Sequence, residues 1–209
     1  MAKKSASTEL HEVSPNNPCP FLRGLVANGK INDDVATLGD LTTAIQQVAK
    51  TGEGQPTLPC AAIRGVALIA NGFGPLTAAR NALQGVQINE LRNGPLDKKG
   101  VGSGILDALG KINYKELDRL DDFATDKTAN NGTVERGLNA AEIKRMMDAN
   151  FERAAGHRRV VDRKMMDAEW PILLDVMGKK GKAGRYLSVI DVRELFTNRQ
   201  FPQRMQKQF

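Results

Sequence analysis

Apolar residues recur at helical spacing along most of the chain, whereas the period-two alternation of half-buried strands is almost absent. The repeats predict helices at about residues 20–28, 40–48, 61–70, 76–83, 105–109, 117–123, 139–151 and 159–177, and a last helix that begins at Ser188 or Asp191. Pro171 should kink the longest of these helices or divide it in two. The pattern therefore predicts an all-α fold, a single helical domain of about eight to ten helices with at most one short β-hairpin.

The polar positions divide the chain into three parts. Residues 1–16 show no periodicity and predict an extended N-terminal arm. Residues 17–204 contain every expected helix, and residues 205–209 are expected to form a tail. With 209 residues, the chain is long enough for one domain with a sizeable core.

The sequence Pro18-Cys19-Pro20 opens the first predicted helix. Pro20 suits the first helical position because its φ is preset and it has no N–H group to leave unpaired. Cys19 then falls at the N-cap of this helix. Asn28-Gly29 should end the helix, since glycine adopts the left-handed conformation that often follows a helix.

The position of Cys19 suggests a chemical role for its sulfur. Unpaired backbone N–H groups and the positive end of the helix dipole lower the pKa of a thiol and favour the thiolate, the form that binds metals and attacks electrophiles. The alternative is a small buried residue in a proline-rich turn, and the local sequence does not decide between the two. Cys60 also follows a proline but has neither a second proline nor an Asn-Gly stop, so a buried small residue is its expected role.

Composition narrows the classes of function. An apolar content of 41% and a charged content of 26% fit a soluble globular protein, and the longest apolar run, residues 66–70, is far too short to span a bilayer. We therefore expect no membrane partner. The net charge of +6 would suit nucleic acid, but the basic residues are scattered among acidic ones and no aromatic RNA-binding motif accompanies them, so no nucleic-acid partner is predicted.

Two further exclusions follow from residue counts and from the first residues. The chain has two cysteines, without the ligand spacing of a zinc site and too few for a disulfide scaffold. The first residues are basic, but no apolar stretch follows them. This pattern predicts a cytoplasmic protein, or a secreted one if a leader has been removed.

The Pro-Cys-Pro triplet and residues 22–29 behind it resemble the motif of the heme-thiolate chloroperoxidase and unspecific peroxygenase family. In that family the motif reads Pro-Cys-Pro and then Leu-x-x-Leu-Ala-Asn-His-Gly, and the cysteine is the axial ligand of heme iron. This chain lacks the histidine of the motif. The resemblance implies heme b as the cofactor, Cys19 as its iron ligand, and a binding site that includes Pro18, Pro20, Leu22 and Arg23.

The C-terminal quarter is similar to the same family in two places. Glu169 falls where the family has its acid-base glutamate, and Phe196, Arg199, Phe201 and Pro202 resemble a terminal Phe-Phe-x-x-x-Arg-Leu-Pro motif, with phenylalanine for leucine. The resemblance implies that Glu169 moves a proton between the two oxygens of peroxide while the thiolate donates electron density. Arg163 is the nearest matching cation for stabilising the leaving oxygen, with Arg159 and His157 as weaker options. Without the family, Glu169 would be interpreted as a surface carboxylate on an amphipathic helix.

The match in the middle of the chain is the poorest. Residues 112–126 resemble the acidic metal-binding segment of the family, but Ile112 and Tyr114 stand where its glutamate and aspartate would be. A shifted alignment would use one of two acidic pairs, Glu116 with Asp118 or Asp121 with Asp122. We therefore predict no separate Mg or Mn site.

Together these patterns predict an enzyme, a hydrogen-peroxide-dependent heme-thiolate peroxidase or peroxygenase that oxidises or oxygenates a small apolar or aromatic organic substrate. The alternative is a heme-free helical binding protein on the same scaffold, which the missing histidine and the altered metal motif suggest. The sequence identifies neither the substrate nor the oligomeric state. A homodimer is one possible oligomeric state.

Overall fold

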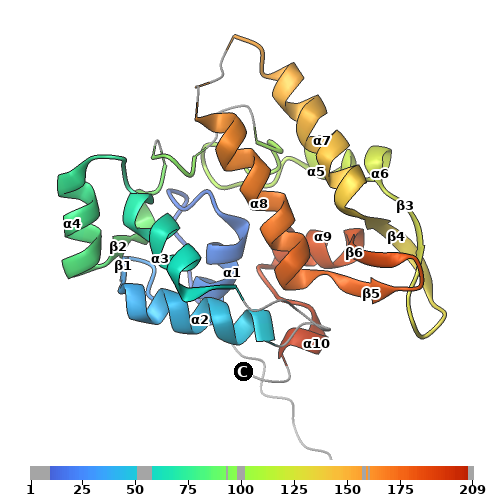
Figure 1. Ribbon diagram of the computed structural model, residues 1–209, viewed down its shortest axis with the longest axis horizontal. Helices are drawn as coiled ribbons and strands as arrows, with labels where there is room; N and C mark the ends of the chain where they lie inside the picture. The colour runs from blue at the N-terminus through green and yellow to red at the C-terminus, as the bar shows by residue number, and fades with distance from the viewer. Residues whose placement is uncertain are drawn as a thin grey trace, which may run out of the picture.

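The computed structural model describes residues 10–50, 58–92, 94–97, 102–156, 159 and 161–206. Figure 1 labels the elements α1 (Pro20–Ala27), β1 (Val35–Ala36), α2 (Leu38–Lys50), α3 (Cys60–Ile69), α4 (Pro75–Gln84), β2 (Val86–Gln87), α5 (Tyr114–Asp118), α6 (Leu120–Phe123), β3 (Thr125–Thr128), β4 (Val134–Leu138), α7 (Ala140–Arg153), α8 (Asp162–Met177), β5 (Lys179–Gly181), β6 (Gly184–Ser188), α9 (Val189–Asn198) and α10 (Gln203–Gln206), and a 3-10 turn spans Ile88–Glu90. Helix α8 crosses the middle of the molecule, with α1–α4 on one side and strands β3–β6 on the other.

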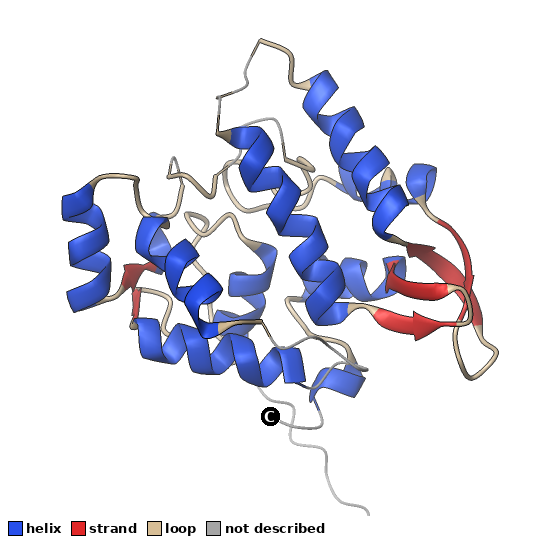
Figure 2. Ribbon diagram, viewed as in Figure 1, coloured by secondary structure: helices blue, strands red, loops and turns tan. Residues whose placement is uncertain are grey.

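The all-α prediction is wrong, because the C-terminal half contains a four-stranded antiparallel sheet in the order β3-β4-β6-β5 (Figure 2). Strands β1 and β2 pair as a second, smaller sheet. The strands carry little period-two signal because they are short and mostly polar: β3 is Thr-Asp-Lys-Thr, and none of its residues is buried. Such a strand is held by backbone pairing and by its turn rather than by an apolar face.

The β3–β4 hairpin depends on two glycines. Gly132 lies in the turn with φ +90°, a conformation that glycine adopts without strain. Gly137 faces Tyr186 of β6, and a Cβ at this position would lie 2.5 Å from the tyrosine ring. The missing side chain at Gly137 therefore lets the buried Tyr186 pack against the neighbouring strand.

Several helix predictions also need correction. Residues 105–109 form a turn rather than a helix, in which the Asp107 side chain accepts hydrogen bonds from two backbone N–H groups at 2.8 Å each. The predicted helix at residues 117–123 is divided into α5 and α6. Helix α8 begins at Asp162 and continues through Pro171 as one helix.

The predicted arm and tail are partly integrated into the fold. Residues 1–9 lie outside the described residues, but residues 10–16 contact the domain: the His11 N–H donates to the Ala27 carbonyl at 2.9 Å, and the Ser14 N–H donates to Asp33 at 2.9 Å. Residues 203–206, across the predicted start of the tail, form α10. Residues 10–16 of the predicted arm are thus tied down beside α1.

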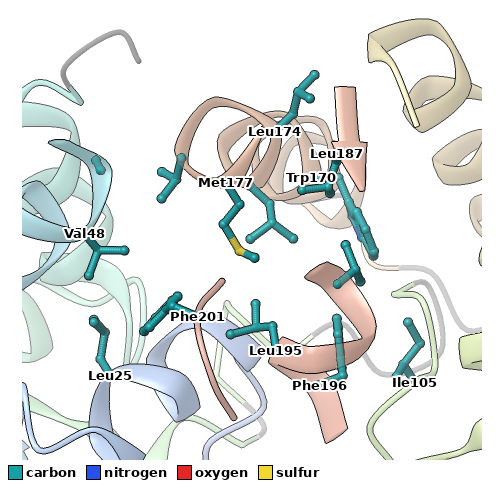
Figure 3. Close-up of a cluster of buried hydrophobic side chains, with 14 of the residues drawn as sticks. Leu25, Val48, Ile105, Trp170, Leu174, Met177, Leu187, Leu195, Phe196 and Phe201 are labelled. Atoms are coloured by element: carbon teal, nitrogen blue, oxygen red, sulfur yellow. The ribbon is translucent and has the colours of Figure 1, made fainter. Parts of the chain in front are cut away.

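The hydrophobic core lies where α1, α2, α8 and α9 meet. Figure 3 shows Leu25 of α1, Val48 of α2, Met177 of α8 and Leu195 of α9 converging around Phe201, and each of these side chains is 0% exposed. Burial of a side chain of this size stabilises the fold by about 1.5–3 kcal/mol. The core therefore joins the first helix of the chain to its last third.

Helix α7 begins at the capping box that the sequence predicts. The Asn139 side chain accepts from the Glu142 N–H at 3.0 Å, and Glu142 accepts from the Asn139 N–H at 2.7 Å. Glu142 also accepts from Thr125 at 2.6 Å and pairs with Lys127 at 2.8 Å, so it joins β3 to α7. Burial alone would raise the pKa of Glu142, but the hydrogen bonds from Lys127, Thr125 and Asn139 outweigh burial and lower this pKa below its ordinary value.

Replacing Glu142 by glutamine is expected to lower the free energy of unfolding by about 1.5–3 kcal/mol near neutral pH, the range for hydrogen bonds to a charged group. The folded state lowers the pKa of Glu142, so its charge stabilises the fold above the unfolded pKa of about 4.3. This stabilisation is lost as the pH falls through the folded value. Urea unfolding should therefore show a larger difference between wild type and variant at about pH 7 than at about pH 3.

The exposed Glu194 provides the control for this experiment. Glu194→Gln is expected to change the free energy of unfolding by less than about 0.5 kcal/mol at either pH. Equal destabilisation by Glu142→Gln at both pH values would contradict the stabilising role of the Glu142 charge, because the loss of stability would then not depend on that charge.

Candidate functional site

An apolar cavity of about 840 Å³ lies among the N-terminal end of α1, helices α2, α3 and α8, and the chain segment that follows the 3-10 turn. Its volume falls within the range of pockets that hold small molecules and cofactors, roughly 300–1,000 Å³. Aliphatic and aromatic side chains make most of its wall, and a few polar or ionisable ones interrupt it: Asn16, Cys19, Arg92, Asp97, Ser103 and Glu169. The ionisable groups therefore face a mainly apolar space.

Helix α1 presents Cys19 to this cavity. As the sequence predicts, Cys19 is the N-cap and Pro20 opens the helix: the Cys19 backbone is extended, with φ −87° and ψ 113°, and its carbonyl accepts from the Arg23 N–H at 3.0 Å. The Asn17 side chain accepts from the Cys19 N–H at 3.1 Å and fixes the turn. The partly exposed sulfur is thus held at the positive end of the α1 dipole, which favours an anion there.

The far end of α1 also follows the sequence prediction. Asn28 is the C-cap, and Gly29 has φ +66°. The Asn28 side chain donates to the carbonyls of Gly24 at 2.7 Å and of Arg199 at 2.9 Å, so it ties α1 to the end of α9. A Cβ at Gly24 would lie 3.0 Å from both Leu195 and Phe201. Because glycine has no side chain, α1 can approach α9 this closely.

Glu169 lines the same cavity from α8. It is half-buried, and its neighbour Trp170, which is 5% exposed, also lines the wall. The fold therefore brings together Cys19 and Glu169 from opposite ends of the sequence. A carboxylate and a thiol that line one apolar cavity can divide proton transfer and ligation between them.

Of the other residues predicted for heme binding, Pro18, Pro20 and Leu22 line the cavity, whereas Arg23 does not. Arg23 is 7% exposed and donates to the carbonyls of Ser14 at 2.9 Å and Asn17 at 3.2 Å. Burial lowers the pKa of Arg23, and the nearby cations lower it further. Arg23 therefore acts on the turn that carries Cys19 rather than on a ligand in the cavity.

The structure does not bring Arg163 to the cavity. It lies six positions before Glu169 on α8, which places it roughly 120° away around the helix axis. Its guanidinium pairs with Asp148 at 2.7 Å and with Asp167 at 3.0 Å, and stacks 5.4 Å from the centre of the Phe151 ring. The hydrogen bond to Asp148 raises the pKa of Arg163.

The two weaker options for this cation, Arg159 and His157, do not supply it in the described structure either. Arg159 pairs with the buried Asp162 at 2.7 Å and donates to the carbonyls of Asp97 at 2.8 Å and Gly94 at 3.3 Å. It is not among the residues that line the cavity. His157 lies outside the described residues.

Arg92 is the cavity cation that sequence reasoning missed. It follows the 3-10 turn, and the Arg92 N–H donates to the Asn16 carbonyl at 2.9 Å, beside the Pro-Cys-Pro turn. No motif marks it, because its position on the cavity wall depends on packing between segments far apart in sequence.

Three of the four acidic residues considered for the middle segment, Glu116, Asp118 and Asp121, pair with arginines. Glu116 pairs with Arg153 at 2.7 Å and Arg119 at 2.9 Å, and these hydrogen bonds outweigh the opposing effect of burial and lower the pKa of Glu116. Asp118 and Asp121 both pair with Arg193, at 2.7 Å and 2.9 Å. Among the residues that the structure describes, no three His, Cys, Asp or Glu side chains gather as a metal site would require.

Cys60, which the sequence analysis expects to be buried, is exposed at the start of α3 and accepts a hydrogen bond from Gln46 at 3.0 Å. Neither Cys19 nor Cys60 is in a disulfide. Within the described part of the chain, no helix has the length and apolar character needed to cross a bilayer. Comparison with known proteins finds no match to this chain among protein-family models, curated proteins or solved structures.

Proposed function

We propose that the cavity binds heme b, that Cys19 would hold its iron, and that the protein is a hydrogen-peroxide-dependent peroxidase or peroxygenase. The observation that carries the proposal is that Cys19 and Glu169 line one apolar cavity of about 840 Å³. The chemistry of the donor set fits this cofactor, because a cysteine at a helix N terminus supplies an anionic sulfur and the surrounding wall is apolar. The resemblance of the Pro-Cys-Pro segment to heme-thiolate enzymes adds independent support.

When bound, heme iron would supply the cleavage of the peroxide O–O bond, and the thiolate of Cys19 would favour that cleavage by donating electron density. Glu169 would accept the proton from one peroxide oxygen and return it to the other, so that this second oxygen leaves as water. Trp170 and the aliphatic wall would limit the access of bulk water to the reacting oxygens. The cavity would hold a small apolar or aromatic substrate next to them.

The alternative is a heme-free binding protein that uses the same cavity. Two observations support it: Glu116, Asp118 and Asp121 of the middle segment are paired with arginines, and Arg163 lies away from the cavity. In this case the cavity would bind an apolar ligand, and neither Cys19 nor Glu169 would take part in a reaction.

Loading the purified protein with hemin separates the two functions. We expect tight binding at one heme per chain. We also expect the reduced carbon monoxide complex to show the red-shifted Soret band that a thiolate ligand gives. Peroxide-dependent oxidation of a small aromatic substrate should accompany it. A protein that binds no heme, or whose reduced complex lacks the thiolate band, would overturn the enzyme proposal and favour the heme-free alternative.

A further inference from the structure

Arg92 is the one lysine or arginine among the described residues that line the cavity. Two backbone carbonyls orient its guanidinium: Nε donates to Pro15 at 3.2 Å, and Nη2 donates to Asp107 at 2.5 Å. The Arg92 side chain is only 14% exposed. The cation is therefore fixed in position on an otherwise apolar wall.

The hydrogen-bonding capacity of this guanidinium is only partly used. A guanidinium carries five N–H donors, and among the described residues the partner of Arg92 Nη1 is the Asp97 carboxylate, whose oxygen lies 3.6 Å away, beyond hydrogen-bond distance. The Asp97 side chain is 11% exposed, and the Asp97 carbonyl is held by Arg159 at 2.8 Å. A carboxylate that reaches Nη1 from the cavity would give this donor a closer, charge-assisted partner than Asp97 does.

We propose that the cavity takes a ligand with an apolar body and a carboxylate, and that Arg92 binds this carboxylate through Nη1. A charge-assisted hydrogen bond of this kind is about twice as strong as a neutral one. The proposal rests on the cavity and Arg92, and it does not depend on the iron chemistry proposed above. A porphyrin propionate and a long-chain carboxylic acid both have this chemistry.

The two sources are separated by measuring each acid against its methyl ester. The porphyrin pair is protoporphyrin and protoporphyrin dimethyl ester, followed by quenching of Trp170, the only tryptophan in the chain and a residue of the cavity wall. The second pair is dodecanoic acid and methyl dodecanoate, followed by displacement of a neutral fluorescent naphthylamine. These readouts need neither iron nor turnover.

We expect the wild-type protein to bind the acid of at least one pair about tenfold more tightly than the ester, because only the acid adds a hydrogen bond between charged groups; tenfold corresponds to about 1.4 kcal/mol. Arg92→Gln should reduce this ratio to about twofold or less. Arg92→Lys, which keeps the charge but loses the planar fork, should give an intermediate ratio. Arg145→Gln, at an exposed position on α7, is the control and should leave the ratio unchanged.

Asp97→Asn provides a test of opposite sign. Because the Asp97 carboxylate lies near Nη1, its negative charge should oppose an incoming anion, and removing the charge is expected to tighten acid binding several-fold without changing ester binding. This variant also keeps the inference testable if Arg92→Gln does not fold.

Each outcome has one meaning. Preference for the porphyrin acid, lost in Arg92→Gln, supports the inference and identifies the porphyrin as the ligand class. Preference for dodecanoic acid alone supports the inference and counts against the heme proposal. Three outcomes would overturn the inference. They are equal binding of acid and ester in both pairs, an acid preference that survives in Arg92→Gln, and no binding of any of the four compounds.

Discussion

Replacing Cys19 by alanine is expected to abolish the thiolate band of the reduced carbon monoxide complex completely. The proposed iron ligand is the Cys19 sulfur, which α1 holds on the cavity wall at its N terminus. Alanine offers no ligand atom at this position. The measurement is the reduced-plus-carbon-monoxide spectrum of hemin-loaded wild type and variant at matched heme content.

The fold should tolerate this change. The Cys19 side chain makes no capping hydrogen bond to α1, so its loss should change the free energy of unfolding by less than about 1 kcal/mol. Cys19→His is a second variant that keeps a ligand atom, and it should replace the thiolate band by the spectrum of an imidazole-bound heme. This shift would show that the variant still folds and still presents position 19 to the iron.

Cys60→Ala is the matched control, because Cys60 is the only other cysteine of the chain and does not line the cavity. It should keep the full thiolate band. If Cys19→Ala retained the band and Cys60→Ala lost it, the iron ligand would be Cys60 and the assignment of the cavity would be wrong.

Replacing Glu169 by glutamine is expected to lower peroxide-dependent turnover by roughly 10²–10⁴-fold. This range is the usual contribution of a positioned acid-base group. Glutamine keeps the size of the side chain and its hydrogen-bonding capacity but cannot accept and return a proton near neutral pH. The thiolate spectrum and the affinity for protoporphyrin should stay unchanged, because the proposed iron ligand is Cys19 and the proposed carboxylate-binding residue is Arg92. Steady-state turnover and the reduced carbon monoxide spectrum are measured on the same preparation.

Asp167→Asn is the control for Glu169→Gln, because it also removes one negative charge from α8 but at a position outside the cavity. Asp167 is half-exposed and pairs with Arg163. Its replacement should leave turnover within about twofold of the wild type. A similar fall in both variants would indicate that the charge of α8, rather than proton transfer by Glu169, sets the rate.

The sequence predicted local features well where one short segment contains the whole physical cause. Pro20 and Gly29 bound α1 because a fixed φ favours a helix start and a positive φ favours a helix end. The Asn139–Glu142 capping box starts α7 because its two hydrogen bonds lie within four residues. The position of Cys19 at a helix mouth follows from the same local rules.

The sheet could not be predicted in this way. Strand β3 carries no apolar alternation, and its pairing with β4 depends on the turn at Gly132 and on the space that Gly137 leaves for Tyr186. Strand β6 joins the sheet beside β4 although α7 and α8 separate them in the chain. Pairing between strands so far apart depends on tertiary packing, which short-range periodicity does not report.

The ends of α1, the start of α7 and the thiol at a helix N terminus were predictable from the sequence, since each depends on backbone geometry within a few residues. The lining of the cavity was not, because it depends on tertiary packing. Packing brought Cys19 and Glu169 to one cavity, directed Arg163 to Asp148, and added Arg92, which no motif marks. The reason is physical: a cavity forms where helices from distant parts of the chain fail to fill the space between them, and that remaining space depends on how the whole core packs.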